Sequence, residues 1–361
     1  MTTLDVVLGF CVDPREGPME RTQNDSEGFV DKRPLRNYWY VVALGDDLGL
    51  NPISVKLLNE DFVIWRGSDG GLIAAEEKCP HRQAPLSHGY LENGCLVCPY
   101  HGWTFGKSGK CINIPSSADG VPIPSRSHLK TFDVIEKYGL IWLCIGEPIN
   151  PLFDLREESD PSFRRINTEV QKWEVAATRM VDNFLDITHF PYVHSGTFGA
   201  GQETKVPNIT LEFLDDDFFG YRYEVLAANP KEAKSTSGSD EEVVERSMTS
   251  GFNLPLTVKS TITYKSGLEH VILLLSTPID ETSSYFTFVI WRNDDFSIPA
   301  EEVISFDRAI GEEDRVMLEK LNGVMPLDKT ALVNVQSDKA TVEWRRQLFN
   351  LINSELNSIQ A

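Results

Sequence analysis

Cys79-Pro80-His81-Arg82 and Cys98-Pro99-Tyr100-His101-Gly102-Trp103 decide the fold of the N-terminal half of this 361-residue chain. Each stretch supplies one cysteine and one histidine, in the pattern C-x-H-x16-C-x2-H. Two thiolates and two imidazoles can bind a zinc ion, or a two-iron cluster with cysteine on one iron and histidine on the other. We favour the two-iron cluster, because zinc knuckles more often pair like ligands, C-x2-C with H-x3-5-H. Each loop here carries one ligand of each kind and would bridge both irons. Zinc stays as the alternative.

Short strand-like runs surround these loops and are separated by turn signals about ten residues apart, as in an all-β domain. Among them are Tyr38–Val42, Phe62–Trp65 and Gly139–Cys144. We expect this domain to cover residues 37–150 and to end in a proline-containing linker. Residues 1–36 show no persistent periodicity and are expected to form a tail.

The second half, residues 151–361, mixes long strands with helices. We expect an α+β domain of the helix-grip type, a curved antiparallel sheet with helices on one side. The polar segment Asn229–Glu242 is expected to be a loop. Strands are predicted over 220–227, 257–264, 270–276 and 285–292, and helices over 300–321 and 338–358.

A second motif, N-x2-D-x2-H-x4-H, runs from Asn183 to His194. The spacing from Arg179 to His189 is helical, which would place residues 183, 186 and 189 along one helix face. His194 lies about 140° further round an ideal helix, so it could not share a metal ion with His189 unless the helix were broken. We expect Pro191 to break it. Two histidines and a carboxylate with open positions form the non-haem Fe(II) triad.

The composition limits the classes of partner and compartment. Lys and Arg total 34 against 54 Asp and Glu, a net charge of -20, which disfavours nucleic acid and anionic membranes. The longest apolar run is far shorter than the roughly 20 residues of a membrane span. Six cysteines in a chain of this length do not form a disulfide framework, and Met1–Gly28 lacks the pattern of a signal peptide. We therefore expect a cytoplasmic protein.

The first motif resembles that of Rieske [2Fe–2S] proteins of the oxygenase and ferredoxin type. Gln83 is a departure, because glycine is usual there. With the second motif, residues 37–361 resemble the Rieske non-haem iron oxygenases in order and spacing. The resemblance implies four cluster ligands, Cys79, His81, Cys98 and His101, with Arg82 and Trp103 in the cluster surroundings.

The same resemblance implies a mononuclear iron bound by His189, His194 and a distant carboxylate. We choose Asp314 as that carboxylate, with Glu313, Asp307 and Asp338 as alternatives. Asn183 is expected to lie just behind the ligands. Asp186 resembles the carboxylate that links an iron-bound histidine, here His189, to a cluster histidine of a neighbouring subunit, here His101.

The family then implies a homotrimer that takes electrons from NAD(P)H through a ferredoxin or flavin reductase and uses O2 as co-substrate. We expect it to hydroxylate or oxidatively demethylate a small or medium organic molecule. One alternative is an aromatic ring cis-dihydroxylating dioxygenase. A Rieske electron carrier without oxygenase activity is the alternative from a different class.

Overall fold

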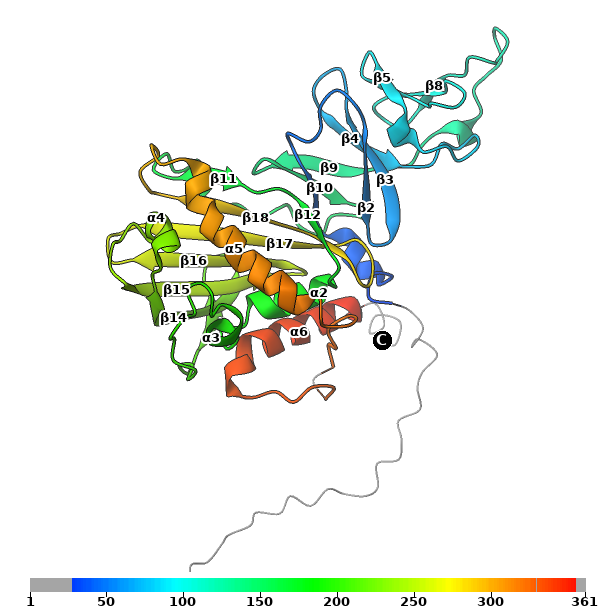
Figure 1. Ribbon diagram of the computed structural model, residues 1–361. Coiled ribbons are helices and arrows are strands. Elements are labelled where there is room, and N and C mark those ends of the chain that lie inside the picture. The colour runs from blue at the N-terminus through cyan, green and yellow to red at the C-terminus, as the bar shows by residue number, and fades with distance from the viewer. Residues whose placement is uncertain (1–27, 329, 355–361) are drawn as a thin grey trace, which may run out of the picture.

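The computed structural model describes residues 28–328 and 330–354 and contains two unequal parts (Figure 1). Of the expected tail, residues 1–36, the first 27 lie outside the described residues. From residue 28 onward the chain is packed, because Phe29, Val30 and Leu35 are buried in the same core cluster as strands of both parts. This end of the expected tail therefore belongs to the fold.

The N-terminal part consists of two antiparallel sheets, as an all-β domain requires. The six-stranded sheet has the order β1-β10-β9-β4-β3-β2 and the four-stranded sheet the order β5-β6-β7-β8. The cysteine loops lie between β4 and β5 and between β6 and β7, so the small sheet holds them together (Figure 1). The strands are β1 (Tyr40–Leu44), β2 (Ile53–Leu57), β3 (Glu60–Arg66), β4 (Leu72–Glu76), β5 (Tyr90–Glu92), β6 (Cys95–Val97), β7 (Thr104–Phe105), β8 (Cys111–Asn113), β9 (Thr131–Lys137) and β10 (Leu140–Cys144).

The C-terminal part is built on an antiparallel eight-stranded sheet with the order β11-β18-β17-β16-β15-β14-β13, and β12 pairs with β18. The four long strands predicted from the sequence are confirmed, whereas β15 was not predicted. The strands are β11 (Arg164–Asn167), β12 (Gln171–Trp173), β13 (Leu211–Phe213), β14 (Phe219–Ala228), β15 (Val243–Asn253), β16 (Thr257–Tyr264), β17 (Glu269–Pro278) and β18 (Ser284–Arg292).

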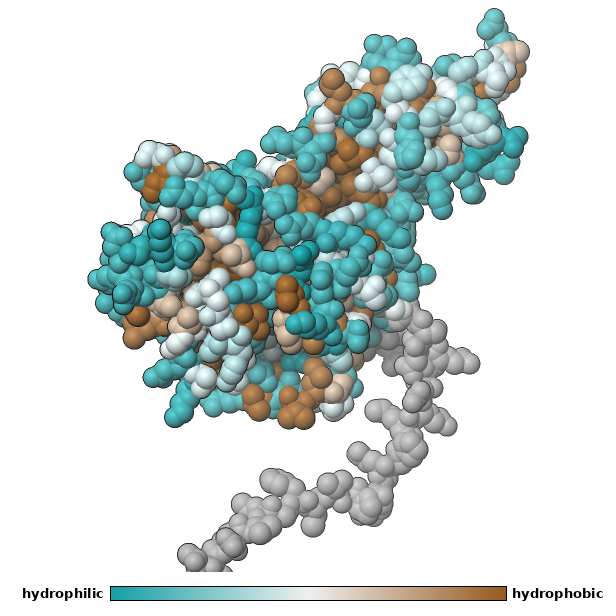
Figure 2. Space-filling model, in the orientation of Figure 1, coloured by the Kyte–Doolittle hydropathy of each residue, from teal (hydrophilic) through white to brown (hydrophobic). Residues whose placement is uncertain are grey.

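Helices cover one face of this sheet, and α5 crosses it obliquely (Figure 1). The predicted α+β fold is confirmed, and the two predicted C-terminal helices correspond to α5 and α6. No helix in the described part of the chain combines the length and apolarity that a membrane span needs. Hydrophilic residues cover most of the face on which α5 and α6 lie (Figure 2). The helices are α1 (Arg156–Ser159), α2 (Ala177–Phe184), α3 (Phe190–Val193), α4 (Lys234–Ser237), α5 (Ala300–Leu318) and α6 (Lys339–Ile352).

Three local expectations were wrong. The segment 229–242 is not simply a loop, because it contains α4, and the buried Thr236 hydroxyl donates to the Val303 carbonyl of α5 at 2.9 Å. The helix expected to run to His189 ends at Phe184. Pro191 does not break a helix but lies in the first turn of α3, where its missing N–H costs nothing.

The strand register sets the inner face of the sheet. Side chains alternate between the two faces of a strand, and residues paired across strands share a face. Arg246 of β15 pairs with Tyr264 of β16, and His270 of β17 pairs with Arg292 of β18. These four residues are buried and lie at one end of the helix-covered face, while Ser250 and Ser260 pair further along it.

Candidate metal centres

The two cysteine loops have the same backbone turn, although their sequences differ. In each loop the cysteine amide donates to the carbonyl five residues on, and the amide four residues on donates back to the cysteine carbonyl. In the first loop Cys79 N–Ala84 O is 2.9 Å and Gln83 N–Cys79 O is 2.8 Å. In the second, Cys98 N–Trp103 O is 2.9 Å and Gly102 N–Cys98 O is 3.1 Å.

This turn explains the unusual residue of the first motif. Gln83 and Gly102 occupy equivalent positions, with φ angles of 57° and 71°. Both values lie in the left-handed region, which glycine adopts without strain and other residues adopt at a cost. Gln83 therefore occupies a position where the loop geometry favours glycine.

The loops place the four cluster candidates in two pairs. Cys79 and Cys98 are buried, and burial, with the neighbouring Cys98 sulfur, raises the pKa of the Cys79 thiol to about 12. His81 and His101 are exposed, with ring centroids 4.5 Å apart. This donor set fits a cluster with a thiolate-bound iron inside and an imidazole-bound iron at the surface. Trp103 stacks on His81 at 4.6 Å, whereas Arg82 is exposed beside it.

The second motif begins at the end of α2, continues through a turn and ends just after α3, and both helices pack under α5. Asn183 belongs to α2, Asp186 follows that helix, and His189 and His194 flank α3. The sequence suggested that Asp186 and His189 lie on one helix face. The structure instead places both residues after the end of α2. Thr188 holds the turn, because its amide and hydroxyl donate to Asp186 Oδ1 at 2.9 and 2.7 Å.

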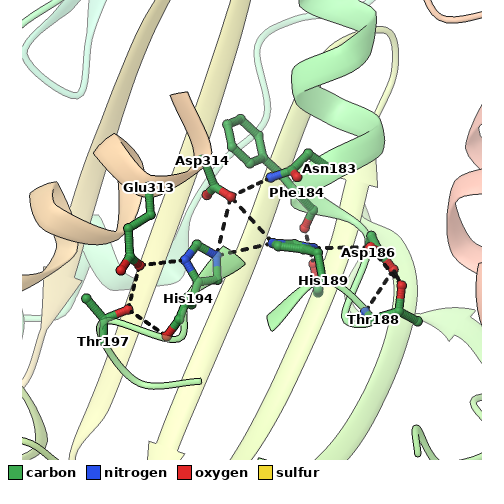
Figure 3. Close-up of polar contacts among 10 residues, drawn as sticks. Asn183, Phe184, Asp186, Thr188, His189, His194, Thr197, Glu313 and Asp314 are labelled. Atoms are coloured by element: carbon green, nitrogen blue, oxygen red, sulfur yellow. Dashed lines mark hydrogen bonds and ion pairs between the residues drawn. The ribbon is translucent and has the colours of Figure 1, made fainter. Parts of the chain in front are cut away.

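His189, His194 and Asp314 converge on one point (Figure 3). His189 Nε2 and His194 Nε2 are 3.2 Å apart, and Asp314 Oδ1 lies 3.5 and 3.3 Å from them. Ligands about 2.1 Å from one metal ion, at right angles, lie about 3 Å apart. Three acceptors this close need a proton or a metal ion between them, and the donor set fits the facial triad of a non-haem iron.

Each of the three side chains has a partner that orients it (Figure 3). His189 Nδ1 donates to Asp186 Oδ2 at 3.1 Å, and His194 Nδ1 donates to Glu313 Oε2 at 2.9 Å. These bonds direct the Nε2 lone pair of each imidazole toward the common point. Asn183 Nδ2 donates to Asp314 Oδ1 at 2.9 Å.

The electrostatics of this group follow from its burial and its ion pairs. Burial lowers the pKa of His189, but Asp186 and Asp314 outweigh burial and raise it to about 9. Burial raises the pKa of Asp314, yet the two histidines hold that pKa far below its ordinary value. The site thus strongly favours a negative carboxylate facing a positive charge, which a bound metal ion supplies.

The three alternative carboxylates have other contacts. Glu313 contacts His194 on the side away from the convergence point and accepts a bond from Thr197 at 2.7 Å. Asp307 lies 3.3 Å from His270 Nε2, and Asp338 accepts from the Val335 amide at the start of the 3-10 turn before α6. Only Asp314, of the four carboxylates considered, lies within reach of both imidazole Nε2 atoms.

A cavity of about 130 Å³ opens beside the three converging residues. It lies between the inner face of the sheet and α5, and its lining is predominantly apolar. The apolar lining consists of Phe184, Phe190, Phe198, Met248, Ile262, Ile272, Leu274, Phe286, Phe288, Phe306 and Ile310. The few polar groups include Arg246 and Asp307.

Sequence reasoning missed several residues of the site. Glu313 was considered only as a ligand, and Thr197 and Arg246 were not considered at all. Thr197 stands three residues after His194, a spacing that carries no signal on its own. Arg246 could not be placed, because its strand, β15, was not predicted.

A buried cysteine pair with exposed imidazoles, followed by a two-histidine, one-carboxylate site in a second domain, is the arrangement of an oxygenase with two metal centres. Residues 38–133 match the Rieske [2Fe-2S] domain, and residues 173–354 match the vanillate O-demethylase oxygenase C-terminal domain. The chain belongs to the Rieske non-haem iron oxygenases of the vanillate O-demethylase type. It is an oxidoreductase that carries a [2Fe-2S] cluster and a mononuclear iron and uses O2 with electrons from a reductase. The zinc and electron-carrier alternatives are set aside by this membership.

The relatives cover nearly the whole chain. It is 30% identical to methylxanthine N1-demethylase of Pseudomonas putida over 92% of this chain and 93% of that one. It is 27% identical to the vanillate O-demethylase oxygenase subunit of a Pseudomonas species, over 90% and 97%.

Solved structures show the same architecture. The Pseudomonas putida methylxanthine demethylase with caffeine matches with a TM-score of 0.77 and 26% identity, over 91% of this chain and 94% of that one. Dicamba monooxygenase bound to 3,6-dichlorosalicylic acid matches with a TM-score of 0.76 and 25% identity, over 91% and 99%.

Proposed function

We propose that this protein oxidatively removes a methyl group from the nitrogen or oxygen of a small, largely apolar molecule. The observation that carries the proposal is the apolar cavity that opens directly beside His189, His194 and Asp314. Relatives named as N- and O-demethylases support this choice within the family.

We assign the cluster to Cys79, His81, Cys98 and His101, and the mononuclear iron to His189, His194 and Asp314. When bound, these metals supply electrons and activate O2. Asp186 and Glu313 keep both imidazoles in the tautomer that leaves Nε2 free. The aromatic and aliphatic walls exclude water and hold the methyl group next to the triad.

The reaction balances with one O2, two electrons and two protons for each methyl group. One oxygen atom enters a methyl C–H bond and the other leaves as water. The hydroxymethyl group then separates from its nitrogen or oxygen as formaldehyde, and that heteroatom takes up the proton.

The electrons are proposed to come from NAD(P)H through a ferredoxin or flavin reductase and to cross between subunits. Within one chain, the four-stranded sheet with the cysteine loops lies at the end of the molecule remote from α2 and α3 (Figure 1). His81 and His101 are exposed, and the Asp186 side chain is 23% exposed, so a neighbouring subunit could contact all three. In a homotrimer, Asp186 would link His189 to the partner's His101 and bury these exposed side chains. We also propose that the protein is cytoplasmic.

The test is turnover of the purified, iron-loaded protein with NADH, a reductase and a panel of N-methyl and O-methyl aromatic compounds. We expect formaldehyde and the demethylated product in equal amounts for at least one compound. A cis-diol without formaldehyde would instead show a ring-dihydroxylating dioxygenase. Cluster reduction with no oxygenated product from any compound would contradict the proposal.

A further inference from the structure

Arg246 is a buried cation that faces the cavity without a charged partner. Its residue exposure is 4%, and it lines the same cavity as His189 and His194. Among the residues that the structure describes, its Nε finds no hydrogen-bond acceptor, and none of the ion pairs includes it. Its contacts are instead with two aromatic faces, Phe198 and Tyr264, each 5.6 Å from the guanidinium carbon.

A buried guanidinium without an acceptor is costly, because it loses its hydration and gains no hydrogen bond in return. Arg292, the other buried arginine at this end of the sheet, does have partners. Arg292 donates to His270 Nδ1 at 2.9 Å and to Asp294 at 2.6 Å, and His270 Nε2 lies 3.3 Å from Asp307. His270 Nδ1 accepts from Arg292, so its Nε2 carries the ring proton that faces Asp307. Asp307 also lines the cavity but forms no ion pair with Arg246, so within the described residues Arg246 has no anionic partner.

We propose that Arg246 binds the carboxylate of the substrate, so that the substrate is a small, flat N- or O-methylated carboxylic acid. This inference rests on the proposed demethylase function and adds the chemical class of substrate. A guanidinium presents paired N–H donors that match the two oxygens of a carboxylate, and a single arginine balances a single negative charge.

The position of Arg246 also sets the orientation of the substrate. The Phe198 ring lies between the guanidinium and the triad, with its centroid 5.0 Å from that of His194. A flat molecule held by its carboxylate at Arg246 would lie along Phe198 and Met248, and its opposite end would reach the metal. Arg246 is thus a specificity-determining residue, and the methyl group to be removed stands at the end opposite the acid.

The experiment compares three probes of nearly equal shape with the full-length, metal-loaded protein. These are 4-methoxybenzoate, the neutral 4-methoxybenzamide and the cationic 4-methoxybenzylamine, with binding measured by calorimetry. We expect the acid to bind about ten to a hundredfold more tightly than the amide, the usual value of a hydrogen bond to a charged group. Arg246→Gln should abolish this ratio, and Arg246→Lys should restore part of it.

Arg222→Gln is the matched control, because it removes the same charge from a residue of β14 whose side chain is 56% exposed. It should leave the acid-to-amide ratio unchanged. Because the readout is a ratio within each variant, partial loss of folded protein does not affect it.

Three results would overturn the assignment. The protein could bind the acid and the amide equally, or bind neither of them. It could also prefer the cationic amine and lose that preference in Asp307→Asn. Formaldehyde release separates this inference from the proposed function. Acid binding that depends on Arg246 but gives no formaldehyde contradicts demethylation alone. Equal demethylation of acid and amide by wild type and Arg246→Gln contradicts the carboxylate site alone.

Discussion

Glu313 accepts a hydrogen bond from His194 Nδ1 at 2.9 Å, although its neighbour Asp314 faces the metal side of the same imidazole. Consecutive residues of α5 therefore hold His194 from opposite sides. With Asp186 on His189, both histidines of the triad have a carboxylate behind them.

Glu313→Gln should weaken binding of the mononuclear iron by about ten to a hundredfold, the usual effect of losing a partner of a metal ligand. The measurement is iron retention against a chelator, with the cluster spectrum recorded to show that the first domain is intact. Glu312→Gln changes an adjacent carboxylate that pairs with Arg315 at the surface and should retain iron as wild type does. Equal retention by both variants would mean that Glu313 does not support His194.

Asp314→Ala should remove the mononuclear iron and the activity together, while leaving two irons in the cluster. Asp307→Asn should keep all three irons, because Asp307 pairs with His270 rather than with the triad. The measurement is the number of irons per chain in each purified variant. Full iron in Asp314→Ala would exclude Asp314 as a ligand.

Asp186→Asn should slow electron transfer between the centres by orders of magnitude while the protein stays folded and retains its cluster. The amide keeps the shape of the side chain but loses the charge that stabilises a protonated imidazole. The reduced protein is mixed with substrate and O2, and cluster re-oxidation is followed in a single turnover. Re-oxidation at the wild-type rate would show that Asp186 only braces the turn through Thr188.

The metal-free protein should lose stability as the pH rises from about 6.5 to 9. The folded-state pKa of His189 is raised to about 9, so its protonated form stabilises the fold below pH 6.5 and that contribution disappears at higher pH. The shift corresponds to about 3 kcal/mol. Thermal melts of metal-free protein should show this loss, and iron-loaded protein should not, because the metal replaces the proton. A pH-independent melting temperature without metal would contradict the pairing of His189 with two carboxylates.

Gly102→Ala should destabilise the cluster domain by about 1–2 kcal/mol, because a left-handed backbone disfavours any side chain. The added Cβ would also come within 3.1 Å of Pro115. Gln83→Gly, at the equivalent position of the first loop, should be neutral or stabilising by up to about 1 kcal/mol. Denaturation followed through the cluster absorbance compares the two. Equal losses would show that the loops are not equivalent.

The positions proposed as ligands could be chosen from the sequence because short loops fix them locally. A cysteine and a histidine two or three residues apart cannot be far apart in space, whatever the rest of the fold does. The same holds for His189 and His194, although the reason for their convergence was predicted incorrectly. The chain leaves the helix after Phe184 and begins another at Phe190, so the turn brings the two imidazoles together.

The partners of the ligands could not be predicted, because they depend on how α5 lies over the turn. Asp314 and Glu313 are adjacent acidic residues in an acidic helix, and only the rotation of α5 decides which one faces both imidazoles. Strand β15 was missed for a related reason. Its inward positions include Arg246 and Ser250, so the cavity residues interrupt the apolar alternation by which a strand is recognised.

The short helix α4 forms part of the hairpin connection between β14 and β15, and its Thr236 reaches the cavity wall while neighbouring positions such as Glu232 stay at the surface. Connections of this kind tolerate insertions and deletions at small energetic cost. In evolutionary terms, one wall of the cavity can therefore diverge between descendants of a gene while the residues around the iron stay fixed. This architecture would thus let a lineage change one wall of the cavity by remodelling the connection between β14 and β15, without changing the residues that face the iron site.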